Sequence, residues 1–307
     1  MSRSYGVSGG KRIYEGYNAE RKVIGRKDKA KRRNGTAAPE SLAAPAKLPK
    51  EFENQIVCGD SLDVLKLMPA NCVDMILTSP PYNFGLDYQT SDDTQNWDEY
   101  FRQLFLILRE GFRVLKHGGR LIINVQPLFS DYIPTHHVIS QKMMDMGMLW
   151  KGEILWEKNN YNCKYTAWGS WKSPSSPYLK YTWEFLEVFC KGSRKHAGAA
   201  SEADITGDEF KKWVYAKWSI APETKMAHYD HPAMFPEALA ERVIKLFSFR
   251  NDLILDVFNG AGTTTAVAHR LGRRYLGIDI SEEYCRTAQL RIEDAAIERS
   301  TCLFADA

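Results

Sequence analysis

The chain has 307 residues, of which 44% are apolar, and a formal net charge of +3, so it can bury one large α/β core with an inserted subdomain. No apolar run reaches membrane-spanning length, and the amino terminus lacks the apolar core of a signal peptide, so we expect neither a membrane protein nor a secreted one. The six cysteines show no paired CxxC spacing, so we expect no metal site, no disulfide framework and a cytoplasmic location.

Residues 1–50 differ in charge from the rest of the chain. They carry 13 Lys and Arg against 4 Asp and Glu, whereas residues 51–307 carry 28 against 34. This tail has few large apolar residues, so we expect it to be disordered. It could add sequence-independent phosphate contacts, act as a nuclear address, or be only a solvated tail, and the sequence leaves these readings open.

The globular part begins near Phe52 with a predicted strand over 55–58 and a helix over 61–67. Asp60 lies between them, where an acid is either a helix cap or a ligand acceptor. A second buried strand is predicted over 73–77. The segments that follow are predicted to be a polar lid over 85–96, a helix over 97–116 with Lys116 and His117 capping its end, a strand over 120–125, a helix over 135–146 and a strand over 150–157.

The loop after the second strand reads Thr78-Ser79-Pro80-Pro81-Tyr82-Asn83. Two prolines fix φ and remove two N–H donors, so the carbonyls of Ser79 and Pro80 can accept from a ligand. Acceptors beside the flat face of Tyr82 suit a planar ring with an exocyclic amino group, which indicates a nucleobase. The alternative for this tetrapeptide alone is a rigid turn.

A second candidate site lies between 252 and 281. A strand over 253–258, a turn over 259–262, a helix over 263–272 and a strand over 274–279 form a complete β-turn-α-β unit, and a last helix is predicted over 282–298. Gly260 and Gly262 allow close approach of a ligand, and Asp279 can accept both hydroxyls of a ribose. A third glycine is missing, so we expect a nucleoside-type cofactor rather than a pyrophosphate.

The region 161–230 combines tryptophans and tyrosines with lysines, which suits displaced bases and phosphates. Some of these aromatic residues must belong to the core, because residues 181–189 alternate like a half-buried strand. An amphipathic helix over 231–247 then leads to the second candidate site.

Together these segments resemble the S-adenosylmethionine-dependent DNA amino-methyltransferases, in particular the beta-order group, whose catalytic loop precedes the cofactor loop. The resemblance covers 52–295 and is closest to the N4-cytosine type with a Thr-Ser-Pro-Pro-Tyr motif. It rests on five pieces: Cys58-Gly59-Asp60, Thr78-Ser79-Pro80-Pro81-Tyr82, His231-Pro232-Ala233-Met234-Phe235-Pro236, Asp256-Val257-Phe258-Asn259-Gly260-Ala261-Gly262 and Tyr275-Leu276-Gly277-Ile278-Asp279.

The resemblance implies a Rossmann-like methyltransferase fold, with a mainly parallel seven-stranded sheet, helices on both faces and an antiparallel strand near one edge. We expect a catalytic half at 51–160, a target-recognition region at 161–230 and a cofactor-binding half at 231–307. The resemblance implies that the protein binds double-stranded DNA, so we expect it in the cytoplasm at the nucleoid. The sequence leaves open a cognate restriction endonuclease and the choice between monomer and homodimer.

The resemblance also assigns site residues by group. The catalytic loop is expected to comprise Ser79, Pro80, Pro81 and Tyr82. Residues expected to bind S-adenosylmethionine, and its product S-adenosylhomocysteine, are Asp60, Phe235, Pro236, Asp256, Phe258, Asn259, Gly260, Gly262, Thr263, Asp279 and Ile280. Candidate substrate contacts are Asn83, Trp156 and Asn159.

The expected reaction is methyl transfer to an exocyclic amine, with acceptance of its hydrogens by the Ser79 side chain and the Pro80 carbonyl, and with the target base rotated out onto Tyr82. Ser79 before Pro-Pro-Tyr and Phe235 before Pro236 favour N4 of cytosine over N6 of adenine. The alternatives are an adenine enzyme, an RNA or protein-glutamine methyltransferase, and a non-catalytic DNA-binding module.

Overall fold

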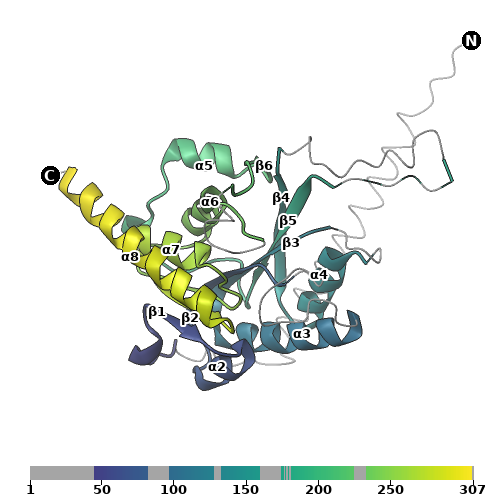
Figure 1. Cartoon of the computed structure of the whole chain (residues 1–307), viewed down its shortest axis with the longest axis horizontal. Helices are drawn as coiled ribbons and strands as arrows, with labels where there is room; N and C mark the ends of the chain where they lie inside the picture. The colour runs from purple at the N-terminus through teal and green to yellow at the C-terminus, as the bar shows by residue number, and fades with distance from the viewer. Residues whose placement is uncertain are drawn as a thin grey trace, which may run out of the picture. The chain divides into compact units, whose positions relative to one another are not determined.

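The computed structural model describes residues 45–81, 97–127, 133–159, 174–175, 177, 179, 181–224 and 233–305, with side chains up to residue 294. The predictions for residues 1–44 of the basic tail, Tyr82, Asn83, the lid, His231, Pro232 and most of 160–180 lie outside this part of the chain. The tail prediction is wrong for residues 45–50, because Leu48 is 3% exposed and packs in the core. The described residues form one eight-stranded sheet with helices on both faces (Figure 1).

The strands follow the order β1-β8-β7-β2-β3-β5-β4-β6 across the sheet. Neighbouring strands pair in parallel except at β5, which is antiparallel to both β3 and β4. The strand bounds are β1 (Gln55–Cys58), β2 (Val73–Thr78), β3 (Leu115–Val125), β4 (Leu149–Glu157), β5 (Trp183–Cys190), β6 (Lys217–Ser219), β7 (Leu253–Asp256) and β8 (Arg274–Asp279).

The helices cover the two faces of the sheet (Figure 1). Apolar side chains of α2, α3 and α4 pack in one core cluster, and those of α6 and α7 pack in a second cluster on the opposite face. The helix bounds are α2 (Ser61–Leu67), α3 (Trp97–Val114), α4 (Thr135–Asp145), α5 (Gly207–Trp213), α6 (Glu237–Phe247), α7 (Thr263–Arg270) and α8 (Glu282–Ala305), with 3₁₀ turns η1 (Lys50–Phe52) and η3 (Ala200–Glu202).

The mainly parallel sheet with one antiparallel strand near an edge is confirmed, but the expected number of seven strands is wrong. The eighth strand is β6, which adds three residues beside β4. Three residues are too few to show a period-2 pattern, so sequence reasoning could not detect it. Both β5 and β6 come from the region 161–230, which therefore contributes core strands in addition to any role in target recognition.

A second correction concerns the end of α3. The helix was expected to continue to Lys116, with Lys116 and His117 as caps, but it ends at Val114 and both residues lie in β3. The Lys116 ammonium instead binds both carboxylate oxygens of buried Asp74 at 2.8 Å. The strand is favoured here because it satisfies a buried charge that a helix end would leave unpaired.

Asp74 also belongs to a cluster at the starts of β2 and β7. Ligand atoms of Asp74, His196 and Asp252 lie within 4.8 Å of one another, a spacing that a metal ion could use. Protein groups already bind the two carboxylates: Lys116 and the Leu253 amide bind Asp74, and His196 and the Phe249 amide bind Asp252. We therefore interpret the cluster as a clamp between strand ends.

Within the described part of the chain, no helix is both long and apolar enough to span a membrane.

Candidate active site

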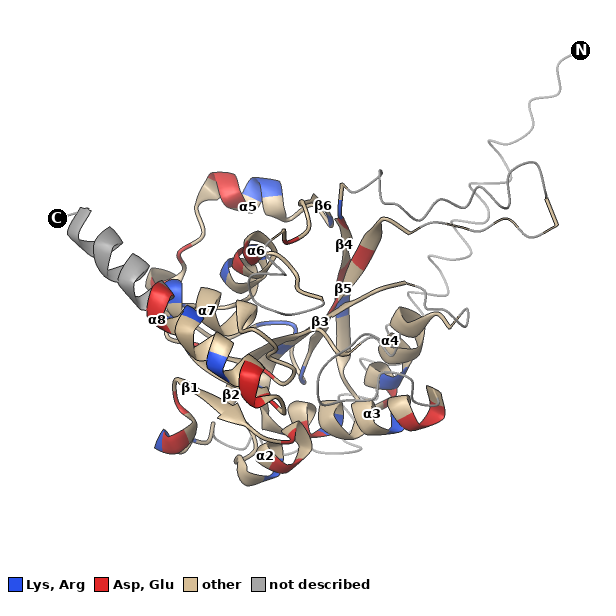
Figure 2. Ribbon diagram, viewed as in Figure 1, with Lys and Arg blue, Asp and Glu red and all other residues tan. Residues whose placement is uncertain are grey.

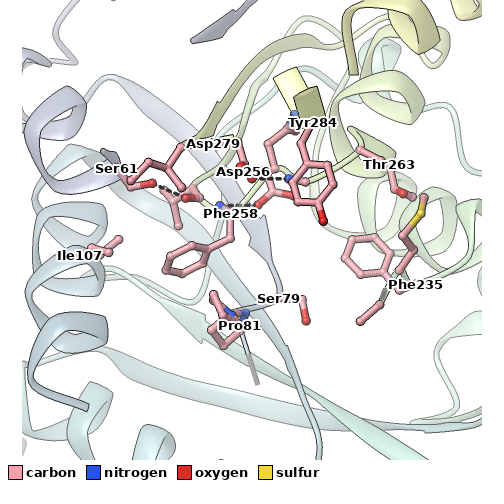
Figure 3. A pocket seen from close by; sticks show the side chains of 18 of the residues that line it. Ser61, Ser79, Pro81, Ile107, Phe235, Asp256, Phe258, Thr263, Asp279 and Tyr284 are labelled. Carbon is pink, nitrogen blue, oxygen red and sulfur yellow. Dashed lines mark hydrogen bonds between the residues drawn. The ribbon is translucent and has the colours of Figure 1, made fainter. Parts of the chain in front are cut away.

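Because β1, β8, β7, β2 and β3 run in parallel, their carboxyl ends meet at one edge of the sheet, where open α/β sheets bind ligands. A cavity of about 220 Å³ opens there, with Ser79 and Pro81 on one side and Asp279 and Tyr284 on the other (Figure 3). Ser79 and Gly260, which are far apart in the sequence, line this same cavity. The two candidate sites are thus one site.

A buried hydrogen-bond cluster joins the two loops. The Thr78 hydroxyl donates to Asp256 Oδ1 at 2.7 Å, and the Thr264 hydroxyl donates to Oδ2 at 2.7 Å. The Phe258 amide also donates to Oδ1, at 3.1 Å. Burial raises the pKa of Asp256 to about 6. Asp256 lines the cavity, but its carboxylate mainly holds the strand end before Ser79 against the turn that contains Gly260.

Asp279 lies at the end of β8 and is fixed by backbone groups. Its Oδ2 accepts from the Gly260 amide at 2.7 Å and its Oδ1 accepts from the Ser281 amide at 3.0 Å. Gly260 has φ +48°, a conformation that glycine adopts at little cost. Burial raises the pKa of Asp279. Each carboxylate oxygen has more than one acceptor site, so both can still accept a ligand hydroxyl.

Asn259 lines the cavity and packs against the neighbouring strand. Its side chain lies over Gly277, where an added Cβ would approach the Asn259 side chain to 2.5 Å. Its Oδ1 accepts from the Thr265 hydroxyl at 3.0 Å, and its Nδ2 is buried without a hydrogen-bond partner in the described structure. The Asn259 side chain therefore holds the turn against β8 and α7.

The catalytic loop predicted from the sequence is held from two sides. The Ser79 hydroxyl donates to the Asn124 carbonyl at 3.2 Å, and the Tyr100 hydroxyl donates to the Pro81 carbonyl at 2.7 Å. Pro80 and Pro81 both line the cavity. Because the Ser79 hydroxyl uses its hydrogen in the bond to the Asn124 carbonyl, its oxygen can only accept a hydrogen bond from a ligand.

Asp60 fits both readings of the sequence. It caps α2, because its Oδ1 accepts from the amides of Leu62 at 2.9 Å and Asp63 at 3.2 Å. It also lines the cavity, as does the next residue, Ser61, whose hydroxyl donates to the Val257 carbonyl. One acid can therefore serve as a cap and as a ligand acceptor.

The remaining predicted residues divide into two groups. Phe235, Phe258, Thr263 and Ile280 line the cavity. Pro236 and Gly262 do not: Pro236 is the N-cap of α6, and Gly262 has φ +83° with Ala288 so close that an added Cβ would lie 2.7 Å from its Cβ. These two residues shape the chain around the cavity.

The structure does not bring Trp156 or Asn159 to the cavity. Trp156 is 2% exposed, and its indole N–H donates to the Ile220 carbonyl at 2.9 Å, so its ring belongs to the core. Asn159 accepts from the Ser219 hydroxyl at 2.7 Å at the end of β4. Trp156 cannot stack on a displaced base, because the protein core already covers its ring. Asn159 has no aromatic ring to stack, and its side-chain oxygen is bonded to Ser219.

Sequence reasoning missed several residues of the cavity wall. Ser61 could have been found, since it follows Asp60 at a strand end. The others are apolar, or are aromatic residues on helices, and nothing in their spacing separates a cavity wall from an ordinary core. The missed residues are Ser61, Ile107, Ala233, Met234, Val257, Ala261 and Tyr284.

The site fits a nucleoside-type cofactor. It combines carboxylates at Asp60 and Asp279 with the aromatic residues Phe235 and Phe258. Fold and site together define a Rossmann-like protein with a cavity for a nucleoside-type cofactor beside the loop that contains Ser79.

Comparisons with known proteins identify the family. Residues 73–290 match the family model for the DNA methylases called N6_N4_Mtase. The type II methyltransferase M.HpaI of Haemophilus parainfluenzae is 30% identical over 248 residues, which cover 79% of this chain and 75% of that protein. The DNA adenine methyltransferase YhdJ of Escherichia coli strain K12 is 28% identical over 264 residues, covering 81% and 86%.

Among solved structures, TTHA0409 of Thermus thermophilus complexed with S-adenosyl-L-methionine has a TM-score of 0.64 and 26% identity, covering 79% of this chain and 94% of that chain. The chain belongs to the N6/N4 DNA methylase family. The prediction of a DNA methyltransferase of the N6/N4 family is therefore confirmed, as is S-adenosylmethionine as the cofactor.

Proposed function

We propose that the protein methylates the exocyclic N4 of cytosine in a base rotated out of double-stranded DNA. The observation that carries this proposal is that a neutral hydroxyl, that of Ser79, lines the cofactor cavity. This hydroxyl donates to the Asn124 carbonyl at 3.2 Å, so its oxygen is left as an acceptor. A neutral acceptor in the loop, with Phe235 in the cavity wall, matches the N4-cytosine type of the beta-order group.

The catalytic residues act by position. An exocyclic amine is a poor nucleophile, because its lone pair is delocalised into the ring. Acceptance of one hydrogen by Ser79 Oγ and of another by the Pro80 carbonyl favours a tetrahedral nitrogen whose lone pair faces the cavity. S-adenosylmethionine supplies an electrophilic methyl group on its sulfonium. Tyr82 is the proposed stacking partner of the displaced base, with Asn83 beside it.

The cofactor residues have complementary roles in this proposal. Asp279 accepts the ribose hydroxyls, while the backbone amides of Gly260 and Ser281 keep its carboxylate oriented. Asp60 accepts from the adenine amino group. Asn259 holds the turn that contains Gly260 against β8 and α7. Phe235, Phe258, Thr263 and Ile280 complete the wall, and Asp256, Pro236 and Gly262 hold it in shape.

We place the recognition of the DNA sequence in residues 161–230, between the catalytic half (51–160) and the cofactor-binding half (231–307). The basic tail (1–50) adds phosphate contacts in this proposal. These contacts are independent of sequence, so their removal should reduce the salt dependence of DNA binding without changing the site that is methylated.

Adenine N6 is the second candidate, favoured by the similarity to the DNA adenine methyltransferase YhdJ over 81% of the chain. Mass spectrometry of nucleosides from DNA treated with enzyme and cofactor separates the two. We expect N4-methylcytosine that disappears in Ser79→Ala, whereas Leu67→Ala, at an exposed position on α2, should behave like wild type. Detection of N6-methyladenine without N4-methylcytosine refutes the cytosine assignment.

A further inference from the structure

A polar cluster lies under the catalytic loop and is not explained by the fold alone. Figure 2 shows acidic positions, drawn red, on the neighbouring strands β4 and β5 of the sheet. One acid of β5 is Glu184, which is 2% exposed, and its neighbour Asn124, at the end of β3, is 1% exposed. Charged residues are seldom buried this deeply unless they are paired.

The Glu184 carboxylate binds three side chains from the ends of two strands, β3 and β4. Its Oε2 accepts from Asn124 Nδ2 at 2.5 Å, and its Oε1 accepts from Gln126 Nε2 at 3.3 Å. Lys158, just past the end of β4, forms an ion pair with Oε1. The Lys158 ammonium also lies 5.3 Å from the ring centre of Trp156. The buried Trp156 therefore supports the cation that neutralises Glu184.

This arrangement fixes the orientation of the Asn124 amide. The oxygen and nitrogen of an asparagine side chain are nearly equal in shape, so the hydrogen-bond partners decide which way the amide faces. A carboxylate that is ion-paired with Lys158 can only accept, so Nδ2 must face Glu184. The other end, Oδ1, is buried and has no hydrogen-bond partner in the described structure.

Asn124 is also the residue that orients Ser79. Its main-chain carbonyl accepts the Ser79 hydroxyl proton at 3.2 Å. The Asn124 main chain is held by two links of independent origin, namely the β-ladder to Leu186 and the side-chain bond to Glu184. A small displacement of this carbonyl would redirect the Ser79 hydroxyl, and with it the acceptor that faces the substrate amine.

We propose that Glu184 is a positioning residue for methyl transfer, which acts through Asn124 on Ser79, with Lys158 as its counter-charge. This inference rests on the proposed role of Ser79 as the acceptor of an amine hydrogen. It does not depend on which base is methylated, and Glu184 does not contact substrate or cofactor in it.

The test compares two buried acids of β5. Glu184→Gln keeps the shape of the side chain but removes the charge that orients Asn124 and pairs with Lys158. Glu187→Gln is the matched control: Glu187 is also 2% exposed, but it contacts Trp150 at 3.3 Å instead of Asn124, and burial raises its pKa to about 7, so a neutral amide is a mild change there.

We expect kcat of Glu184→Gln to fall at least about tenfold, because small misplacement of a catalytic group is costly in rate. The Kd for S-adenosylmethionine, measured by calorimetry, and the KM for DNA should stay within about threefold of wild type. Glu187→Gln should keep kcat within about twofold. An unchanged kcat in Glu184→Gln, or an equal loss in both variants, overturns the proposal.

We call the path from Glu184 through Asn124 to Ser79 the relay. A double-mutant cycle with Asn124→Ala tests whether Glu184 acts through this relay. If Glu184 acts through Asn124, the double variant should be no slower than the slower single variant, whereas independent effects would multiply. Multiplied losses overturn the proposal. If Glu184→Gln does not fold, Asn124→Ala alone must show the lower kcat with unchanged cofactor Kd, and an unchanged kcat refutes the relay.

The same samples distinguish failure of the relay from failure of the proposed function. If Ser79→Ala retains wild-type kcat, the amine-acceptor role of Ser79 is wrong and the relay falls with it. If Ser79→Ala is inactive but Glu184→Gln is not slowed, only the relay is wrong. Nucleoside analysis of the products reports the methylated base independently of both results.

Discussion

Replacement of Thr78 by valine tests the link between the two loops. Thr78 is fully buried, and its hydroxyl donates to Asp256 Oδ1 at 2.7 Å. Valine has nearly the same shape, so it creates no large cavity, and its main effect is loss of a hydrogen bond to a carboxylate. Such a bond contributes about 1.5–3 kcal/mol to the free energy of unfolding when the acceptor is charged, and about 1 kcal/mol when it is neutral.

The pKa of Asp256 makes this loss depend on pH. The pKa is raised from 3.8 to about 6 in the folded protein, so the folded state disfavours the ionised form. Asp256 therefore lowers the free energy of unfolding as the pH rises from about 4 to 6, by about 3 kcal/mol in total. Without the Thr78 donor the folded pKa should rise further. The free energy of unfolding then continues to fall above pH 6 in the variant, but not in wild type.

We therefore expect Thr78→Val to lose about 1 kcal/mol at pH 5 and about 2–3 kcal/mol at pH 8 relative to wild type. Urea unfolding followed by tryptophan fluorescence at the two pH values measures both losses. Thr135→Val provides a control whose loss should not change with pH, because the buried Thr135 hydroxyl donates to the main-chain carbonyl of Gln126 and not to an acid. Equal losses of Thr78→Val at pH 5 and pH 8 would refute the reasoning.

Three further outcomes follow from the structure. Asp279→Ala should weaken S-adenosylmethionine binding at least about tenfold in calorimetry, because in the proposed complex two ribose hydroxyls lose their acceptor; an unchanged Kd contradicts the proposed ribose role. Gly262→Ala should cost about 2 kcal/mol or more in chemical denaturation, because of φ +83° and the close Ala288, whereas Gly147→Ala, with φ +96° and no atom within 4 Å of an added Cβ, should cost less; equal losses refute the contact. Lys116→Met should cost about 3 kcal/mol in the same assay, since buried Asp74 loses its counter-charge, and a loss below about 1 kcal/mol shows that the clamp is weak.

Local patterns predicted most of the fold. The helix over 61–67 and the strand over 274–279 were placed at their observed bounds, because a terminating proline and flanking turn residues mark their ends. The helix predicted over 231–247 begins only at Glu237, after Pro236. Missed elements, such as α5 and β6, are short and acquire their structure from tertiary contacts that leave no periodic signal.

The parts of the site that could be predicted are those where the expected chemistry needs an unusual combination of residues in a loop or at a strand end. Ser79, Gly260 and Asp279 were identified from loops that end strands, and all three line one cavity. The supporting contacts could not be predicted, because the Thr78–Asp256 and Glu184–Asn124 bonds join residues that only the folded sheet brings together. Trp156 was predicted to be a substrate contact because Trp156-Glu157-Lys158-Asn159 resembles the family segment whose aromatic residue packs near the flipped base. The sequence alone does not separate such an aromatic residue from one that belongs to the core.

The position of β2 between β3 and β7 has a consequence for synthesis of the protein on the ribosome. When residues up to about 250 have been made, β2 still lacks its neighbour on one side, and β1 lacks β8, its one partner in the described sheet. Such a nascent chain exposes apolar strand edges that invite aggregation. It also lacks every residue of the turn that contains Gly260, so the cavity cannot form before this turn has left the ribosome.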